Sequence, residues 1–265
     1  MPRPSRAAPT SSTTSRFRLS VLAAAALAAA GCGSTERAGP PPPSLASACG
    51  TPPAGLRATP QWLRTLDGVR LYAVTAGRGD TTLVLAHESG AGLCGWLPAM
   101  AYLARHGVRT LAFDFRGYPP SGSPAFGKLN ELAPDLQAAI DGAGTKHVFL
   151  MGASMGGAAA VADGYELRGL DGLISLSGEQ RLPGRNLDAL ANAPKLKTPF
   201  LVIASADDGY LTGAQARQLV ARAGSTDKRA VVFPGTYHGW DLLDLAPFRA
   251  RVYATLLAWL RGHGG

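Results

Sequence analysis

Short apolar and β-branched runs alternate with segments of helical length from about residue 62 onward. This alternation is typical of a mostly parallel sheet that helices cover on both faces. The runs that predict strands span residues 70–75, 82–87, 109–115, 147–153, 172–177, 200–204 and 230–233, and the segments that predict helices span residues 97–105, 131–143, 155–165, 213–223 and 247–261. The sequence therefore predicts one α/β domain over residues 61–265.

The start of the chain has the pattern of an export signal. Four arginines precede an apolar run, Leu19 to Ala30, which is short for a membrane span and ends in small residues before Cys32. The segment Ala29 to Cys32 resembles the lipobox of bacterial lipoproteins, with Ala29 where leucine is usual. We expect residues 1–31 to be a signal peptide and Cys32 to be lipidated, which anchors the protein in the cell envelope, at the outer face of the cytoplasmic membrane. Plain signal cleavage, with a secreted product and an incidental cysteine, is the alternative.

Residues 32–60 have the composition of a spacer. They are rich in Gly, Ser, Ala and Pro and include four consecutive prolines, Pro40 to Pro43. Such a run favours extended polyproline II and has little apolar surface to bury. We therefore expect residues 32–60 to link the lipidated cysteine to the folded domain.

Composition and charge narrow the classes of function. The chain has 265 residues, of which 46% are hydrophobic and 17% charged, as in an ordinary globular domain. The formal charge of +8 includes four N-terminal arginines; without residues 1–31, 22 basic residues face 18 acidic ones, which leaves +4. This balance does not predict a surface for nucleic acid.

Two cysteines remain once Cys32 is set aside. Cys49 and Cys94 form an even pair in a chain that is expected to be exported to an oxidising compartment. We expect a disulfide between them. Two unpaired thiols are the alternative, because a sequence gives no geometry.

Ser154 lies in the glycine-rich segment Gly152 to Gly157, after one predicted strand and before a predicted helix. A sharp strand-to-helix turn pushes such a side chain out of the sheet, and the strained backbone needs small neighbours. The Gly-x-Ser-x-Gly pattern alone is weak in a chain with 33 glycines, so the strand-turn-helix setting carries the interpretation. We predict that Ser154 is a nucleophile.

A serine hydroxyl needs a base to accept its proton and a carboxylate to orient that base. Asp207 and Asp208 follow the predicted strand at residues 200–204, at the edge of a parallel sheet where catalytic residues collect. His238 follows the last predicted strand, and we predict that it is the general base for Ser154.

With these residues in the order Ser, Asp, His, the sequence resembles the α/β-hydrolase family across roughly residues 70–259. The resemblance implies a sheet of about seven or eight strands with helices on both faces and little or no cap. Counting from Pro199 places the acid of the family at Asp208, whereas counting from Ala204 places it at Asp207. Asp208 is preferred, and Asp207 stays open.

The resemblance also implies an oxyanion hole made of two backbone N–H groups. Met155, directly after the nucleophile, supplies the first. The segment His87 to Gly92 resembles the His-Gly-x loop of the family, so Ser89 supplies the second, with an ordinary turn as the alternative for this loop. Glu88 stands where glycine is usual. We expect its carboxylate to point away from the oxyanion, toward an arginine, and its own N–H is an alternative donor.

The segment Asp114 to Tyr118 resembles the Asp-x-Arg-Gly turn of the family, which implies a structural role in holding loops.

Only residues 179–198 separate the strand at residues 172–177 from Pro199, enough for a short helix but not for a lid domain. An open site favours a carboxylic ester hydrolase that acts on small or protruding acyl groups through an acyl-enzyme intermediate. Thioesters, lactones, peptide-like amides and perhydrolysis remain open as reactions.

The chain lacks a phosphate loop, a His-Glu-x-x-His pair and a Cys-x-x-Cys pair, so we expect neither a cofactor nor a metal. The expected partner is a small-molecule ester. The competing hypothesis is a non-catalytic envelope lipoprotein that uses the same scaffold for binding. Glu88 supports it, and the complete set of Ser154, Asp208 and His238 argues against it.

Overall fold

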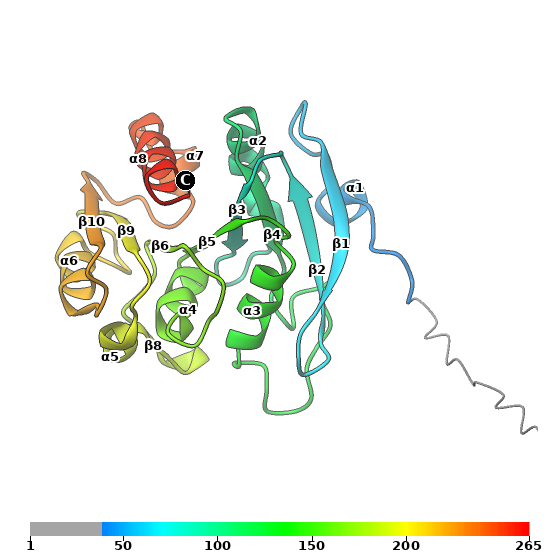
Figure 1. The fold of residues 1–265 in the computed structure, drawn as a ribbon, viewed down its shortest axis with the longest axis horizontal. Coiled ribbons are helices and arrows are strands. Elements are labelled where there is room, and N and C mark those ends of the chain that lie inside the picture. The colour runs from blue at the N-terminus through cyan, green and yellow to red at the C-terminus, as the bar shows by residue number, and fades with distance from the viewer. Residues whose placement is uncertain (1–38, 265) are drawn as a thin grey trace, which may run out of the picture. The chain divides into compact units, whose positions relative to one another are not determined.

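The computed structural model describes residues 39–264, so the expected signal peptide and Cys32 lie outside the described residues. Residues 40–264 form one unit, in which strands and helices alternate along the chain (Figure 1). The strands are β1 (Ala58–Arg64), β2 (Arg70–Ala76), β3 (Thr81–Ala86), β4 (Arg109–Phe113), β5 (His147–Ala153), β6 (Gly172–Leu176), β7 (Arg181–Leu182), β8 (Leu187–Asp188), β9 (Phe200–Ser205) and β10 (Lys228–Phe233). The helices are α1 (Leu45–Cys49), α2 (Leu97–Arg105), α3 (Ala133–Asp141), α4 (Met155–Asp163), α5 (Ala189–Asn192), α6 (Gly213–Arg222), α7 (Asp241–Asp244) and α8 (Arg249–His263).

Eight strands make the main sheet in the order β1-β2-β4-β3-β5-β6-β9-β10. Strand β2 runs antiparallel to both of its neighbours, and the pairs from β4 to β10 are all parallel. The structure confirms the predicted α/β class, with a mostly parallel sheet of eight strands.

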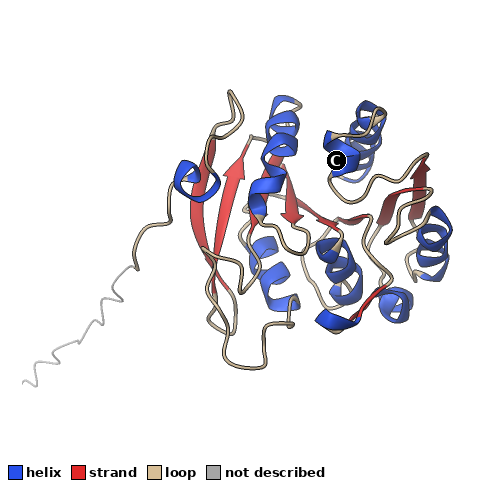
Figure 2. Ribbon diagram, turned by 180° about the vertical axis from the view of Figure 1, so that it is seen from behind, coloured by secondary structure: helices blue, strands red, loops and turns tan. Residues whose placement is uncertain are grey.

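Side chains of the strands alternate between two apolar cores, one on each face of the sheet. In β3, Val84 and Ala86 join one core, while Leu83 and Leu85 join the other. Helices α3, α4, α5 and α6 contribute to the first core and α1, α2, α7 and α8 to the second. Figure 1 shows α2 and α8 on one side of the sheet and α3 and α4 on the other, and Figure 2 shows the same layers from behind. Burial on both faces explains the nearly continuous apolar runs in the sequence.

The strand order creates one place where loops leave the sheet in opposite directions. After β3 the chain forms β4 on one side, then crosses to form β5 on the other side of β3. Helix α2, which follows β3, packs on one face, and α4, which follows β5, packs on the opposite face. Ligands of open α/β sheets bind at such a switch point, outside the carboxyl ends of the strands.

Part of the expected spacer belongs to the fold. Within residues 32–60, α1 buries Leu45, and β1 begins at Ala58 and pairs with β2 over its full length. The Trp62 Nε1–H donates to the Pro40 carbonyl at 2.9 Å, which holds even the proline run against the domain. The predicted linker boundary at residue 60 is therefore wrong, because β1 is an edge strand, where a proline is tolerated.

Helix α8 begins at Arg249 rather than at Pro247, with Phe248 as the preceding residue.

The segment after β6 holds the β7–β8 hairpin, the short helix α5 and two 3₁₀ turns, one of them at Pro183–Arg185. This agrees with the prediction that no lid domain lies there. Within residues 39–264, none of the helices has the length and apolar character that crossing a bilayer requires.

The Asp114 to Tyr118 segment holds loops together through Arg116, which is fully buried. The Arg116 Nε–H and backbone N–H both donate to the Asp135 carboxylate at 2.8 Å. The two terminal guanidinium nitrogens each donate to Asp67 at 3.0 Å, and one of them also donates to the Lys128 carbonyl at 3.2 Å. The guanidinium thus joins the β1–β2 turn to the start of α3. Loss of Arg116 would leave the buried Asp135 carboxylate without its cation.

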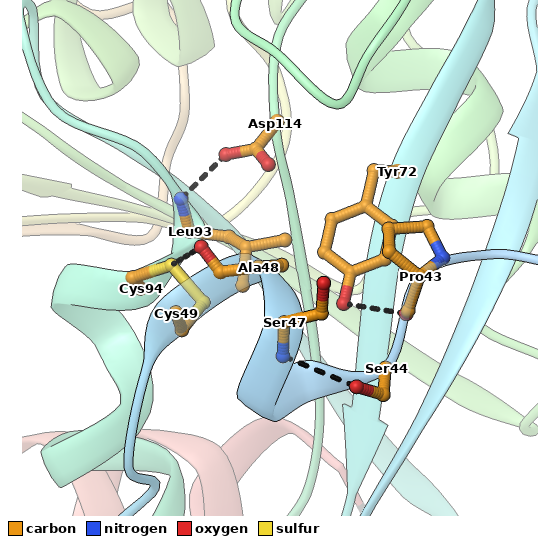
Figure 3. The surroundings of a disulfide bond; sticks show 9 residues. All are labelled: Pro43, Ser44, Ser47, Ala48, Cys49, Tyr72, Leu93, Cys94 and Asp114. Carbon is orange, nitrogen blue, oxygen red and sulfur yellow. Dashed lines mark hydrogen bonds between the residues drawn. A yellow bond between two sulfur atoms is a disulfide. The ribbon is translucent and has the colours of Figure 1, made fainter.

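A disulfide joins Cys49, at the end of α1, to Cys94 in the 3₁₀ turn before α2, with their Cα atoms 5.4 Å apart. Figure 3 shows α1 lying beside this turn, with the Tyr72 hydroxyl donating to the Pro43 carbonyl at 3.2 Å. In the same view the Leu93 N–H donates to the Asp114 carboxylate. The bond closes a loop with a sequence separation of 45 residues.

Replacing both Cys49 and Cys94 by serine should lower the free energy of unfolding by about 2–4 kcal/mol, because the open chain regains loop entropy in the unfolded state. Urea unfolding without reductant, followed by tryptophan fluorescence, measures this change. The Cys32→Ser variant is the matched control and should keep the wild-type midpoint. An unchanged midpoint in the double variant would contradict a stabilising role.

Candidate active site

Ser154 occupies the turn between β5 and α4 in a strained conformation, with φ of 48° and ψ of −117°. Two hydrogen bonds fix this turn: the Ser154 N–H donates to the Leu176 carbonyl at 3.0 Å, and the Ala158 N–H donates to the Ser154 carbonyl at 2.8 Å. A residue other than glycine rarely adopts a positive φ, and where it does the strain is often functional.

Three glycines allow this turn to form. A Cβ atom at position 152 would overlap the Gly156 carbonyl, and one at position 156 would overlap the Ala86 carbonyl of β3. A Cβ atom at position 157 would lie 2.8 Å from the Gly152 carbonyl oxygen. The small neighbours predicted around Ser154 are therefore a steric requirement of the close approach between β3, β5 and α4.

Asp208 and His238 are brought together from the loops after β9 and β10. The Asp208 side chain is fully buried, and its two carboxylate oxygens lie 3.0 and 2.9 Å from the His238 Nδ1 atom. Oδ1 also accepts the Tyr210 N–H at 2.9 Å. Asp207 is exposed, with its N–H on the Gly235 carbonyl. Of the two aspartates left open by the sequence, Asp208 is the one that contacts the histidine.

The contact between Asp208 and His238 lowers the pKa of the aspartate and raises the pKa of the histidine, which favours the ion pair of carboxylate and imidazolium. Burial would raise the Asp208 pKa, but the hydrogen bonds from His238 and the Tyr210 N–H outweigh it, so this pKa is lowered. Burial would lower the His238 pKa, but the hydrogen bond and charge of Asp208 outweigh it, so this pKa is raised. The His238 ring thus gains basicity while Asp208 stays ionised.

Glu179 is a site residue that the sequence analysis did not identify. It follows β6, the neighbour of β5 in the sheet, and the Ser154 Oγ–H donates to its Oε1 atom at 3.4 Å. Among the described residues, no hydrogen bond joins Ser154 to His238. The contact with Glu179 is long for a hydroxyl donor, so the hydroxyl is weakly held. Burial raises the Glu179 pKa. Its place at the carboxyl end of a central strand was the available signal.

Glu88 has a different partner from the arginine that was expected. Its Oε1 atom accepts the backbone N–H of Trp240 at 2.8 Å. Gly239, with φ of 52°, leaves the space for this carboxylate, because a Cβ atom there would overlap it. A hydrogen bond from a backbone N–H to a carboxylate is charge-assisted and holds the side chain in place. Glu88 therefore ties the loop after β3 to the loop that carries His238.

His87, which precedes Glu88, holds the same loop from inside. It is fully buried, and burial lowers its pKa to about 4. Its Nε2 atom accepts the Phe115 N–H at 3.1 Å, which leaves the Nδ1–H to donate to the Glu88 carbonyl at 2.7 Å. Because both ring nitrogens are used in hydrogen bonds to the backbone, the neutral His87 ring has a structural role.

Of the two predicted oxyanion donors, Met155 directly follows Ser154, and Ser89 lies in the loop after β3. Met155 is buried and is the first residue of α4, so its N–H has no acceptor within the helix. Ser89 is exposed in the loop after β3. The Tyr118 hydroxyl packs 3.8 Å from the Met155 Sδ atom and accepts an N–H of Arg185 at 2.8 Å.

A pocket of about 480 Å³ lies between Glu179 and Tyr210. Tyr210, whose side chain is exposed, lies with its ring 4.5 Å from the His238 ring. The pocket is lined by Glu179, Gln180, Arg181, Leu182, Gly209, Tyr210 and Gln215. Within residues 39–264, no three His, Cys, Asp or Glu side chains are grouped so that they could hold a metal ion.

Family models match two parts of the chain. Residues 83–194 match the model described as "Alpha/beta hydrolase family", and residues 180–241 match the one described as "Serine aminopeptidase, S33". A curated relative from Paraburkholderia phymatum, 2-hydroxy-6-oxononadienedioate/2-hydroxy-6-oxononatrienedioate hydrolase, is 34% identical over 113 residues, which are 40% of this chain and 39% of the relative. The chain thus matches less than half of the length of that protein.

Solved structures share the fold at low identity. An esterase from Pyrococcus furiosus matches 80% of this chain and 92% of its own, with a TM-score of 0.64 and 18% identity. The enol-lactonase from Burkholderia xenovorans matches 74% of this chain and all of its own, with a TM-score of 0.60 and 18% identity. Together with the eight-stranded sheet and the strand-to-helix turn at Ser154, these matches show that the chain has the α/β-hydrolase fold.

Proposed function

We propose that the protein is a serine hydrolase that cleaves carboxylic esters through an acyl-enzyme intermediate. The observation that carries this proposal is the pair of His238 with the buried Asp208, at the same carboxyl edge of the parallel strands as Ser154 on its strained turn. A nucleophile, a base and a group that orients the base are the three parts that acyl transfer needs.

Each residue has a role in this reaction. Asp208 accepts the Nδ1–H of His238, which leaves Nε2 as the proton acceptor. The Ser154 hydroxyl turns from Glu179 to His238, gives up its proton and attacks the ester carbonyl carbon. The N–H groups of Met155 and Ser89 stabilise the oxyanion. His238 then protonates the leaving alcohol, and water releases the acid by the same steps.

The substrate class follows from the short connection after β6. The β7–β8 hairpin and α5 leave the pocket beside Glu179 open. Such a site suits small or protruding acyl groups. The names of the relatives, a hydrolase, an esterase and an enol-lactonase, support hydrolysis of esters or of related lactones.

The rival function is a non-catalytic envelope lipoprotein that binds a ligand on the same scaffold. The observation in its favour is that the Ser154 hydroxyl contacts Glu179 rather than His238. A weak contact of this length is easily exchanged when a substrate enters, so hydrolysis remains the stronger proposal.

We further propose that the protein is exported and anchored by a lipid on Cys32. The arginines and apolar run of residues 1–31 support export. The bond between Cys49 and Cys94 supports it independently, because disulfides persist in oxidising compartments outside the cytoplasm.

A fluorophosphonate probe should form a covalent adduct on Ser154, because the probe captures a serine that a neighbouring base activates. Intact-protein mass spectrometry detects the adduct and peptide mapping locates it. The Ser154→Ala variant should stay unlabelled. Lack of any adduct on the wild-type protein would support the binding function instead.

The two neighbouring aspartates should differ sharply in their effect on turnover. Asp208→Asn should lower kcat for a p-nitrophenyl ester by about 10⁴-fold, because His238 loses the group that fixes its tautomer. Asp207→Asn, an exposed change one residue away, should stay within about 3-fold of wild type. Equal losses in both variants would refute the assignment of Asp208.

The pH profile of kcat/KM should rise with an apparent pKa above the ordinary histidine value of about 6.5. The base must be neutral to accept a proton, and the raised His238 pKa moves this deprotonation to higher pH. Initial rates in buffers of constant ionic strength measure the profile, with circular dichroism to confirm folding at each pH. A midpoint at or below about 6.5 would contradict the assignment.

A further inference from the structure

Glu179, which contacts Ser154, has one carboxylate oxygen without a hydrogen-bond partner. Its Oε1 atom accepts the Ser154 hydroxyl at 3.4 Å, while its Oε2 atom is buried and has no hydrogen-bond partner. No lysine, arginine or histidine of residues 39–264 forms an ion pair with it. Burying an ionised carboxylate costs desolvation free energy unless a hydrogen-bond donor or a cation compensates for the lost water.

The charge around this atom is negative. Three carboxylates, those of Glu88, Glu179 and Asp208, act on the single imidazole of His238. Arg181, which lines the pocket, is paired with the Asp188 carboxylate at 3.2 Å, and Arg185 donates to the Tyr118 hydroxyl. The local field therefore favours a cationic ligand over an anionic one.

An aromatic ring lies in the same pocket. Tyr210 lines the pocket together with Glu179, and the residue is 66% exposed. The centroids of its ring and of the His238 ring are 4.5 Å apart, so one residue of the pocket wall packs against the imidazole. A carboxylate and an aromatic face at one pocket are the groups that bind an ammonium ion.

We propose that this pocket binds the ammonium group of the substrate, which makes the preferred substrates esters of amino-substituted acids. The inference rests on the proposed hydrolase function. The amine stays protonated and intact, while the ester C–O bond is the one that breaks. Glu179 is the specificity-determining residue, and Tyr210 covers the cation.

The distances suit an α-amino acyl group. By standard bond geometry its nitrogen lies about 2.5 Å from the carbonyl carbon. That carbon approaches the nucleophile oxygen to about 3–3.5 Å before attack. Because Glu179 Oε1 is itself 3.4 Å from the Ser154 Oγ atom, an ammonium group on the adjacent carbon comes within hydrogen-bond reach of this carboxylate.

The test compares two esters that differ only in the amine, the 2-naphthyl esters of L-alanine and of propionic acid. For the wild-type protein, kcat/KM corrected for spontaneous hydrolysis should be about tenfold to hundredfold higher for the alanine ester, as expected for a charged hydrogen bond. The ratio should fall as the pH rises through the pKa of the ammonium group.

The ratio within each variant separates specificity from general damage. Glu179→Gln keeps the shape but not the charge, and should bring the ratio close to one. Tyr210→Leu, at an exposed position, should lower it part of the way. Glu166→Gln removes an exposed carboxylate outside the site and is the control that should keep the wild-type ratio.

Two failures are distinguishable. Turnover of both esters at equal rates, or an unchanged ratio in Glu179→Gln, would overturn this inference and leave the hydrolase function standing. Lack of turnover with both esters, together with lack of a fluorophosphonate adduct, would overturn the hydrolase function and this inference with it.

Discussion

The structure depends on one close approach of backbone to backbone, where the turn after β5 passes against β3. Carbonyl groups of Ala86, Gly152 and Gly156 occupy the space that side chains would need. Because this contact is made by main-chain atoms, it fixes Ser154 independently of the surrounding side chains. The crossing of the chain at β3 then opens the sheet at this point, so that loops after β3, β6, β9 and β10 can converge there.

The carboxylates of Asp208, Glu88 and Glu179 lie near the His238 imidazole, and each has a different hydrogen-bonding environment. The Asp208 carboxylate is fixed by the His238 ring, and the Glu88 carboxylate accepts a hydrogen bond from the Trp240 N–H. Glu179 has an oxygen that nothing in the described part of the chain satisfies. Carboxylates thus hold an imidazole, join two loops and, in Glu179, keep one oxygen without a partner, according to what lies within hydrogen-bond distance.

Much of the fold could be predicted because buried parallel strands leave continuous apolar runs, and the turn at Ser154 leaves a glycine pattern. Edge strand β1 escaped prediction because it is only partly buried and contains Pro60, which resembles a spacer. Asp207 and Asp208 are chemically identical, and only burial separates them. The partner of Glu88 is a backbone amide 152 residues away, for which no sequence pattern exists. Glu179 was missed because its role depends on the adjacency of β5 and β6.

The position of the disulfide determines how the domain bears mechanical load. Tension on the N-terminal end enters the folded unit before Cys49 and passes through the covalent bond to Cys94. Strands β1, β2 and β3 lie inside the closed loop and are shielded from that force. An edge strand held only by hydrogen bonds to one neighbour would otherwise be the first element to peel away. Under such a load, the three strands between the two cysteines would keep their place in the sheet.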